Sequence, residues 1–173
     1  MKTGLADRLL DALPQTQCQR CGYSDCRDYA RAIAEDGVAI NRCPPGGSEG
    51  IARLGALTHQ PPLPLDSSCG SEAPLSIAQI VGEECIGCAL CIPVCPTDAI
   101  IGAKSCLHVV HEVYCTGCAL CLPACPVDCI RMEAVSGTRT GWDAWSGEQA
   151  ATARERYDFH SARRSLHVRR GAI

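Results

Sequence analysis

Two copies of one cysteine-containing run constrain this chain of 173 residues more than any other feature. The first copy, CIGCALCIPVCPTDAI, begins at Cys85, and the second, CTGCALCLPACPVDCI, begins at Cys115. The copies agree at 11 of 16 positions, and each reads C-x2-C-x2-C-x3-C-P. An internal repeat of this kind indicates two structurally related units that bury a shared core. The repeat therefore predicts a domain with two similar halves.

The cysteine content indicates metal binding rather than disulfides. The chain has 15 Cys but only 4% aromatic residues, so it lacks the side chains that supply much of an ordinary core. An odd number of cysteines leaves one thiol out of any complete disulfide set. The N-terminus carries Asp7, Arg8 and Asp11 where a signal peptide would be apolar, and no stretch is long enough to span a bilayer. We therefore predict a cytoplasmic protein with reduced thiols that act as metal ligands.

The spacing within each run is typical of bacterial-type ferredoxins that hold two [4Fe–4S] clusters. In that arrangement three close cysteines bind one cluster and the fourth cysteine binds the neighbouring cluster. We therefore assign one cluster to Cys85, Cys88, Cys91 and Cys125, and the other to Cys115, Cys118, Cys121 and Cys95. We predict a ferredoxin-like dicluster domain with pseudo-two-fold symmetry, in which strands lie at residues 77–81, 100–101, 107–110 and 130–132.

Four further cysteines near the N-terminus form a separate candidate site: Cys18, Cys21, Cys26 and Cys43. Asp25 is a potential N-cap and Gly37 a potential stop for a helix over residues 27–36, which would return the chain to present Cys43. Four thiolates at this spacing also suit a structural zinc ion. Beside a dicluster domain we favour a third iron–sulfur cluster, because neighbouring clusters extend one electron path.

The segments QCQRCGYSDCRDYARAI and INRCPPGG, followed by the two ferredoxin runs, resemble the B subunit of Rnf-type electron-transport complexes. The resemblance covers residues 5–133. It implies three [4Fe–4S] clusters and electron relay between redox partners, among them other components of an Rnf-like complex. Membrane-bound members of that family begin with a transmembrane helix, whereas this chain starts almost directly at its four-cysteine module.

The predicted fold class is small α+β with four parts. Residues 1–59 form an N-terminal four-cysteine module with helices over 4–13 and 49–58, and residues 60–74 form a Pro- and Ser-rich linker. Residues 75–135 form the dicluster domain. Residues 136–173 form a basic tail, whose helix over 146–164 begins at the capping-box pattern Ser146-x-x-Gln149.

We find no catalytic residue set, no phosphate-binding glycine loop and no nucleotide fingerprint, so we predict an electron carrier or electron-transfer subunit. Residues 139–173 carry seven arginines against four acids, including Arg169 and Arg170. We interpret this tail as a solvated helix face or a dock for an acidic redox partner, with no nucleic acid and no membrane span, although peripheral membrane association stays open. The alternative function is a zinc-binding module whose basic tail contacts nucleic acid.

Five residues stay outside these assignments. Cys69, Cys106 and Cys129 remain after twelve cysteines are assigned, and we interpret them as small buried or loop residues rather than alternative ligands. His108 and His111 are three residues apart in a strand-like stretch, so they would face opposite sides and we interpret both as structural.

Overall fold

The structure is a computed structural model that describes the backbone of residues 4–170 and the side chains of residues 4–166. The side chains of Arg169 and Arg170 and the ends of the predicted first and last segments therefore lie outside the described residues. The chain divides into two compact units. The first contains Met1–Leu75 and Ala134–Ala150, and the second contains Ser76–Glu133 and Ala151–Ile173.

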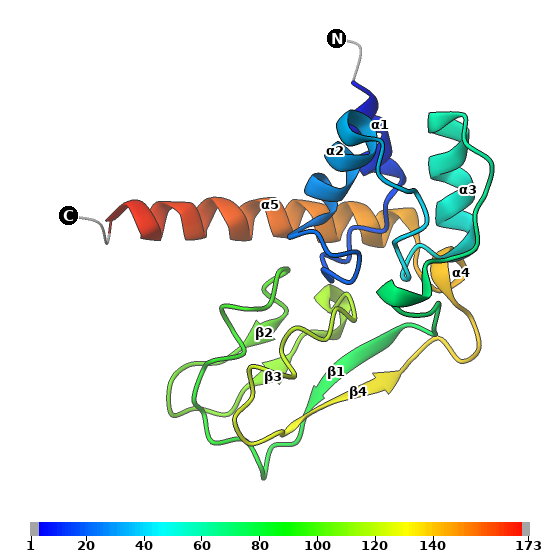
Figure 1. Cartoon of the computed structure of the whole chain (residues 1–173). Helices are drawn as coiled ribbons and strands as arrows, with labels where there is room; N and C mark the ends of the chain where they lie inside the picture. Colours follow the sequence, from blue (N-terminus) through cyan, green and yellow to red (C-terminus); the bar gives the residue numbers. More distant parts are fainter. Residues whose placement is uncertain (1–3, 171–173) are drawn as a thin grey trace. The chain divides into compact units, whose positions relative to one another are not determined.

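The first unit is helical. It contains α1 (Leu5–Ala12), α2 (Cys26–Asp36), α3 (Gly47–Thr58), a short 3-10 helix η1 (Ser67–Cys69) and α4 (Gly141–Ala144) (Figure 1). The three helices predicted at residues 4–13, 27–36 and 49–58 are thus present, with ends shifted by at most two residues. Their apolar faces share one core, in which Leu9, Leu13, Ile40 and Leu54 are almost completely buried.

The ends of α2 are set by the residues that the sequence indicated. The Asp25 carboxylate accepts a hydrogen bond of 2.7 Å from the main-chain N–H of Asp28, which satisfies one of the free donors at the helix start. Gly37 ends the helix in the left-handed region, at φ 66°. Local capping therefore fixes the helix that begins at Cys26.

Residues 60–75 pack within this first unit. The Asn41 side chain donates to the Pro64 carbonyl at 2.7 Å. Further along, the Glu72 carboxylate accepts from the Ser48 N–H at 3.0 Å and from the Thr140 hydroxyl at 2.6 Å. One carboxylate thus joins the start of α3 to the segment that precedes α4.

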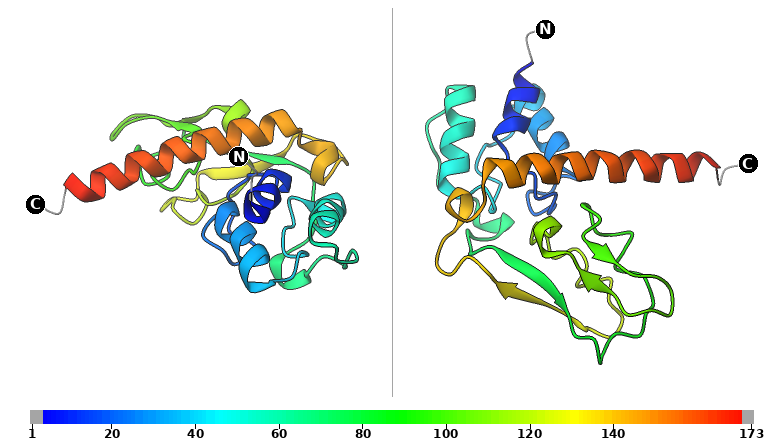
Figure 2. Two further views of the ribbon diagram at one scale, coloured as in Figure 1. Left: turned by 90° about the horizontal axis from the view of Figure 1, so that it is seen from above. Right: turned by 180° about the vertical axis from the view of Figure 1, so that it is seen from behind.

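The second unit has two small sheets. β1 (Ser76–Ile80) pairs with β4 (Ile130–Ala134), and β2 (Ile100–Ile101) pairs antiparallel with β3 (Val109–Val110) (Figure 1 and the right view of Figure 2). In the second sheet Ile100 is opposite Val110 and Ile101 is opposite Val109. The four predicted strands are therefore present, although the third is shorter than predicted. A 3-10 helix η2 (Glu112–Tyr114) precedes the second cysteine run.

The last helix, α5 (Gly147–Arg170), is longer than the predicted 146–164. Its predicted capping box is present, because Gln149 Oε1 accepts from the Ser146 N–H at 2.9 Å and Ser146 Oγ accepts from the Gln149 N–H at 3.1 Å. Within the second unit, Arg156 donates to the carbonyls of Thr97 and Asp98 at 2.6 and 3.2 Å. Over residues 4–170, no helix has both the length and the apolar character required to cross a membrane.

Candidate iron–sulfur sites

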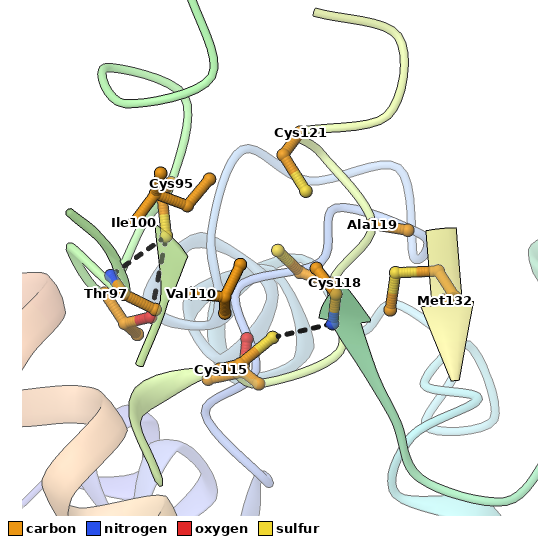
Figure 3. A pocket seen from close by; sticks show the side chains of 12 residues that line it. Cys95, Thr97, Ile100, Val110, Cys115, Cys118, Ala119, Cys121 and Met132 are labelled. Carbon is orange, nitrogen blue, oxygen red and sulfur yellow. Dashed lines mark hydrogen bonds between the residues drawn. The ribbon is translucent and has the colours of Figure 1, made fainter. Parts of the chain in front are cut away.

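One cavity in the second unit is lined by four cysteines from both repeats. They are Cys95 from the first run and Cys115, Cys118 and Cys121 from the second. Figure 3 shows these side chains around one space, whose other walls include Ala78, Ile100, Val110 and Met132. The cavity has a volume of about 330 Å³, part of which is open to solvent. The sequence grouped the same four cysteines into one site.

A second cavity of similar size, about 280 Å³, is lined by the complementary set. Cys85, Cys88 and Cys91 come from the first run, and Cys125 comes from the second. Cys129 and His108 also line this cavity, although the sequence assigned neither to a site. Both cavities therefore combine three cysteines of one run with the last cysteine of the other.

The loops that carry these cysteines adopt strained backbone conformations at matching positions. Ala89 and Ala119, between the second and third cysteines of each run, have φ values of 63° and 61°. Gly87 and Gly117 both have φ 68°, a conformation that favours glycine. Left-handed non-glycine residues cost on the order of 1–3 kcal/mol each and concentrate at functional sites. The repeat therefore reproduces a backbone shape as well as a cysteine spacing.

Both sets contain thiols with shifted pKa values, and in the set that includes Cys85 burial raises the pKa of Cys91. A hydrogen bond from the His108 side chain lowers the pKa of Cys85 to about 7. In the other set, burial raises the pKa of Cys118 to about 11 and that of Cys121 to about 12. Iron binds the thiolate form, so loading of the second set releases protons at neutral pH.

The four N-terminal cysteines are also brought together. Cys21, Cys26 and Cys43 are buried and Cys18 is half-buried. Burial raises the pKa of Cys26 to about 12 and holds that of Cys43 well above its usual value, and repulsion from the other thiols of the group adds to both shifts. Repulsion of this kind places the four thiols within electrostatic range of one another.

Polar side chains fix the loops around this N-terminal group. The Gln17 side chain accepts a hydrogen bond of 2.9 Å from the Cys26 N–H. The Tyr29 hydroxyl donates to the Ala39 carbonyl at 2.9 Å and accepts from the Arg42 N–H at 3.1 Å, which holds the segment that leads to Cys43. These contacts explain how Cys26, at the start of α2, and Cys43, in a loop after that helix, contribute thiols to the same site.

The three remaining cysteines have different surroundings. Cys106 is exposed, whereas Cys69 and Cys129 are buried. Burial raises the pKa of Cys21, and charge repulsion from Cys18 and Cys69 adds to this shift. Cys129 Sγ lies 3.4 Å from Cys125 Sγ. The interpretation of Cys69 and Cys129 as buried residues is confirmed, but it missed that both lie beside candidate ligands.

The residues around the two ferredoxin-type cavities fit [4Fe–4S] clusters. Each cavity offers the four cysteine sulfurs that such a cluster needs, with Cys129 as a fifth in the second cavity, and apolar walls that would exclude water. Over residues 4–166, His, Cys, Asp and Glu side chains form no group of three or more that could hold a single metal ion.

Comparison with known families agrees with this chemistry. Residues 74–132 match the family described as "4Fe-4S dicluster domain", and residues 13–45 match the family described as "Putative Fe-S cluster". No solved structure gives a significant match. The paired cavities and these matches define the class: an iron–sulfur protein with a ferredoxin-type dicluster domain.

Known relatives identify the family more closely. Three proteins, each named as the B subunit of an ion-translocating oxidoreductase complex, are similar over most of this chain. The protein of Azoarcus sp. (strain BH72) is 51% identical over 138 residues, 80% of this chain and 75% of the relative. The protein of Hahella chejuensis is 53% identical over 80% of this chain and 71% of the relative, and that of Alkalilimnicola ehrlichii is 50% identical over 87% and 81%. The chain belongs to this family of Rnf-type B subunits, and the predicted function in iron–sulfur electron transfer is confirmed.

Proposed function

We propose that this chain holds three [4Fe–4S] clusters and passes single electrons between redox partners within an Rnf-like complex. The observation that carries the proposal is the composition of the two cavities. Each includes four cysteines in the crossed combination that a dicluster ferredoxin uses, and the second cavity also contains Cys129. The proposed ligands are therefore Cys85, Cys88, Cys91 and Cys125 for one cluster, and Cys115, Cys118, Cys121 and Cys95 for the other.

Matching hydrogen bonds support pseudo-two-fold symmetry in the dicluster domain. The Val81 N–H donates to the Cys129 carbonyl at 2.9 Å, and the His111 N–H donates to the Ala99 carbonyl at 2.7 Å. The donors Val81 and His111 are 30 residues apart, which is the repeat length, and so are the acceptors Ala99 and Cys129. The two-fold rotation that relates the two halves would also exchange the two cavities.

For the N-terminal module, the four gathered thiols of Cys18, Cys21, Cys26 and Cys43 support a third cluster. The match of residues 13–45 to an iron–sulfur family favours iron over zinc. We further propose the division made from the sequence: a module over 1–59, a linker over 60–74, a dicluster domain over 75–135 and a basic tail over 136–173.

The protein's own residues would bind the clusters, exclude water from them and set their surroundings. Each bound cluster would supply a one-electron couple, so we propose no bond-making chemistry for this chain itself. The chain has a formal charge of −3, which oxidised clusters with four thiolates would make more negative. We therefore expect association with basic redox partners at a rate that falls as salt rises.

The first test is the content of iron, acid-labile sulfide and zinc per full-length chain, purified or reconstituted without oxygen. Three clusters require about 12 iron and about 12 sulfide. About 8 of each with one zinc would instead show that the N-terminal site is structural and that only the dicluster domain transfers electrons.

A double variant then tests the assignment of the N-terminal ligands. Cys18→Ser with Cys21→Ser should remove about 4 iron and leave both ferredoxin signals in electron paramagnetic resonance. The matched control is Cys106→Ser, which changes an exposed thiol outside the proposed sites and should retain the full iron content. Loss of all three signals in the double variant would contradict independent modules.

A further inference from the structure

The two halves of the dicluster domain differ in the side chains that contact ligand sulfurs. Ala78 and His108 occupy equivalent positions, 30 residues apart. The Ala78 N–H donates to Cys115 Sγ at 3.4 Å, and the His108 N–H donates to the sulfur of Cys85. The main-chain contact is thus common to both halves, whereas one half carries a methyl group and the other an imidazole.

A second pair of equivalent positions repeats this difference. The Ala99 N–H donates to Cys95 Sγ at 3.2 Å, and the Cys129 N–H donates to the sulfur of Cys125. Here too the main chain makes the same bond in both halves. The side chain is a methyl group at Ala99 and a thiol at Cys129.

Both larger side chains place a hydrogen-bonding group beside a ligand of the same cavity. His108 Nδ1 lies 3.5 Å from Cys85 Sγ, and Cys129 Sγ lies 3.4 Å from Cys125 Sγ. His108 is 2% exposed and Cys129 is 3% exposed, so water does not compete for either contact. A ligand thiolate can only accept, so the imidazole N–H and the thiol S–H are the donors.

The packing around His108 is adapted to this contact. A Cβ atom at Gly102 would overlap the imidazole ring, so the glycine leaves the space that the ring fills. The equivalent of Gly102 in the other half is Met132, which lines the other cavity together with Ala78. One half therefore pairs the large His108 with the small Gly102, whereas the other half pairs the small Ala78 with the large Met132.

The other ligand set has fewer side-chain donors of this kind. Thr116 donates to the sulfur of Cys118. Thr97 Oγ1 is 3.9 Å from Cys95 Sγ, but its proton is directed to the Tyr114 carbonyl at 2.7 Å. The two sites of the repeat are therefore chemically distinct.

We propose that His108 and Cys129 raise the reduction potential of the cluster held by Cys85, Cys88, Cys91 and Cys125. The inference rests on the proposed function, because it needs a cluster in that cavity. Reduction adds negative charge to a cluster and its thiolates, and hydrogen-bond donors to sulfur stabilise the more negative form. His108 and Cys129 are thus positioning residues that act through Cys85 and Cys125.

The test is a redox titration of the anaerobic full-length holoprotein, followed by electron paramagnetic resonance. His108→Ala and Cys129→Ala should each move the same ferredoxin signal to lower potential. The expected change in the ratio of reduced to oxidised cluster at fixed potential is roughly tenfold, about 59 mV for one electron. Cys129→Ser keeps a hydrogen-bond donor at this position, so its reduction potential should stay close to that of the wild type.

The reciprocal variant uses the other half of the repeat. Ala99→Cys places a thiol at the position equivalent to Cys129 and should raise the potential of the other ferredoxin signal. Iron content is measured on every variant. If all iron is retained and the potentials are unchanged, this inference is overturned and the proposed function stands. Equal shifts of both ferredoxin signals would have the same meaning. A wild-type chain without iron in this cavity would overturn the proposed function itself.

Discussion

The Asp98 carboxylate is one of the contacts that hold α5 against the dicluster domain, and its removal gives a quantitative prediction. The Asp98 carboxylate accepts hydrogen bonds of 2.7 Å from His160 Nδ1 and of 2.7 Å from Arg163 Nη2. The His160 side chain is 5% exposed, whereas that of Arg163 is 42% exposed. Asp98→Asn removes the negative charge and leaves a weaker, neutral acceptor.

The expected cost follows from this difference in exposure. A hydrogen bond to a charged group contributes roughly 1.5–3 kcal/mol, and the buried bond from His160 lies within that range. The exposed pair with Arg163 adds about 0–1 kcal/mol, because water screens it. Since asparagine still accepts one bond, we expect a net loss of about 2 kcal/mol, which raises the population of the detached helix about 30-fold.

The sign of the pH dependence follows from the pKa of Asp98. Burial alone would raise this pKa, but hydrogen bonds from Arg163 and His160 outweigh burial and hold it below the usual value of 3.8. The contribution of the Asp98 carboxylate is therefore fully present above the unfolded pKa and is lost as the pH falls through the lower folded pKa. Between pH 5 and 8, the ionisation of Asp98 should not change the docking of α5.

Hydrogen–deuterium exchange of the holoprotein measures this opening directly. After correction for intrinsic rates, the amides of residues 152–166 should exchange about 30-fold faster in Asp98→Asn. The matched control is Asp128→Asn, which changes the exposed aspartate at the equivalent position of the second repeat. Equal protection in wild type and Asp98→Asn would refute the role given to this carboxylate.

Three smaller changes test other contacts. In the iron-free chain at pH 7, His108→Ala should return the pKa of Cys85 from about 7 part of the way towards 9.0, because the main-chain hydrogen bonds from His108 and Gly87 remain. Alkylation of this thiol, followed by peptide mass spectrometry, should slow by at most about sixfold, since the higher nucleophilicity of the thiolate offsets part of the loss of ionised thiol. An unchanged rate would show that the imidazole does not stabilise this thiolate. Asp25→Ala removes the N-cap of α2 and should cost about 1 kcal/mol, seen as roughly fivefold faster exchange in the first turn of that helix. Trp145→Phe removes the 2.8 Å bond from Trp145 Nε1 to the Pro14 carbonyl and should cost about 2 kcal/mol, seen as faster exchange across α1. Unaltered exchange in either variant would contradict the corresponding contact.

The features that the sequence predicted well depend on local chemistry. A capping aspartate, a terminal glycine and an apolar stripe identify α2 without knowledge of the rest of the fold. The repeated cysteine spacing likewise predicted which cysteines line a common cavity, because the crossed pattern is a property of the run itself. Both signals lie within a few residues of the structure that they specify.

The features that the sequence did not reveal depend on contacts between distant segments. His108 contacts Cys85, which is 23 residues away in the sequence. The spacing between His108 and His111 gave no indication of this contact. Cys129 lies only four residues from Cys125, yet its role depends on the side chain pointing into the cavity. The clamp between Asp98 and His160 spans 62 residues. Tertiary packing, rather than local propensity, decides each of these contacts.

The left-handed alanines of the two cysteine runs have a consequence for biogenesis. Ala89 and Ala119 adopt a conformation that a newly made loop would leave, because an alanine there gains on the order of 1–3 kcal/mol by relaxing. The loops should therefore stay open on the nascent polypeptide and close only as thiolates are captured. In open loops the cysteines would be accessible to iron and sulfide, so the conformational cost at these two alanines would favour cluster insertion before loop closure.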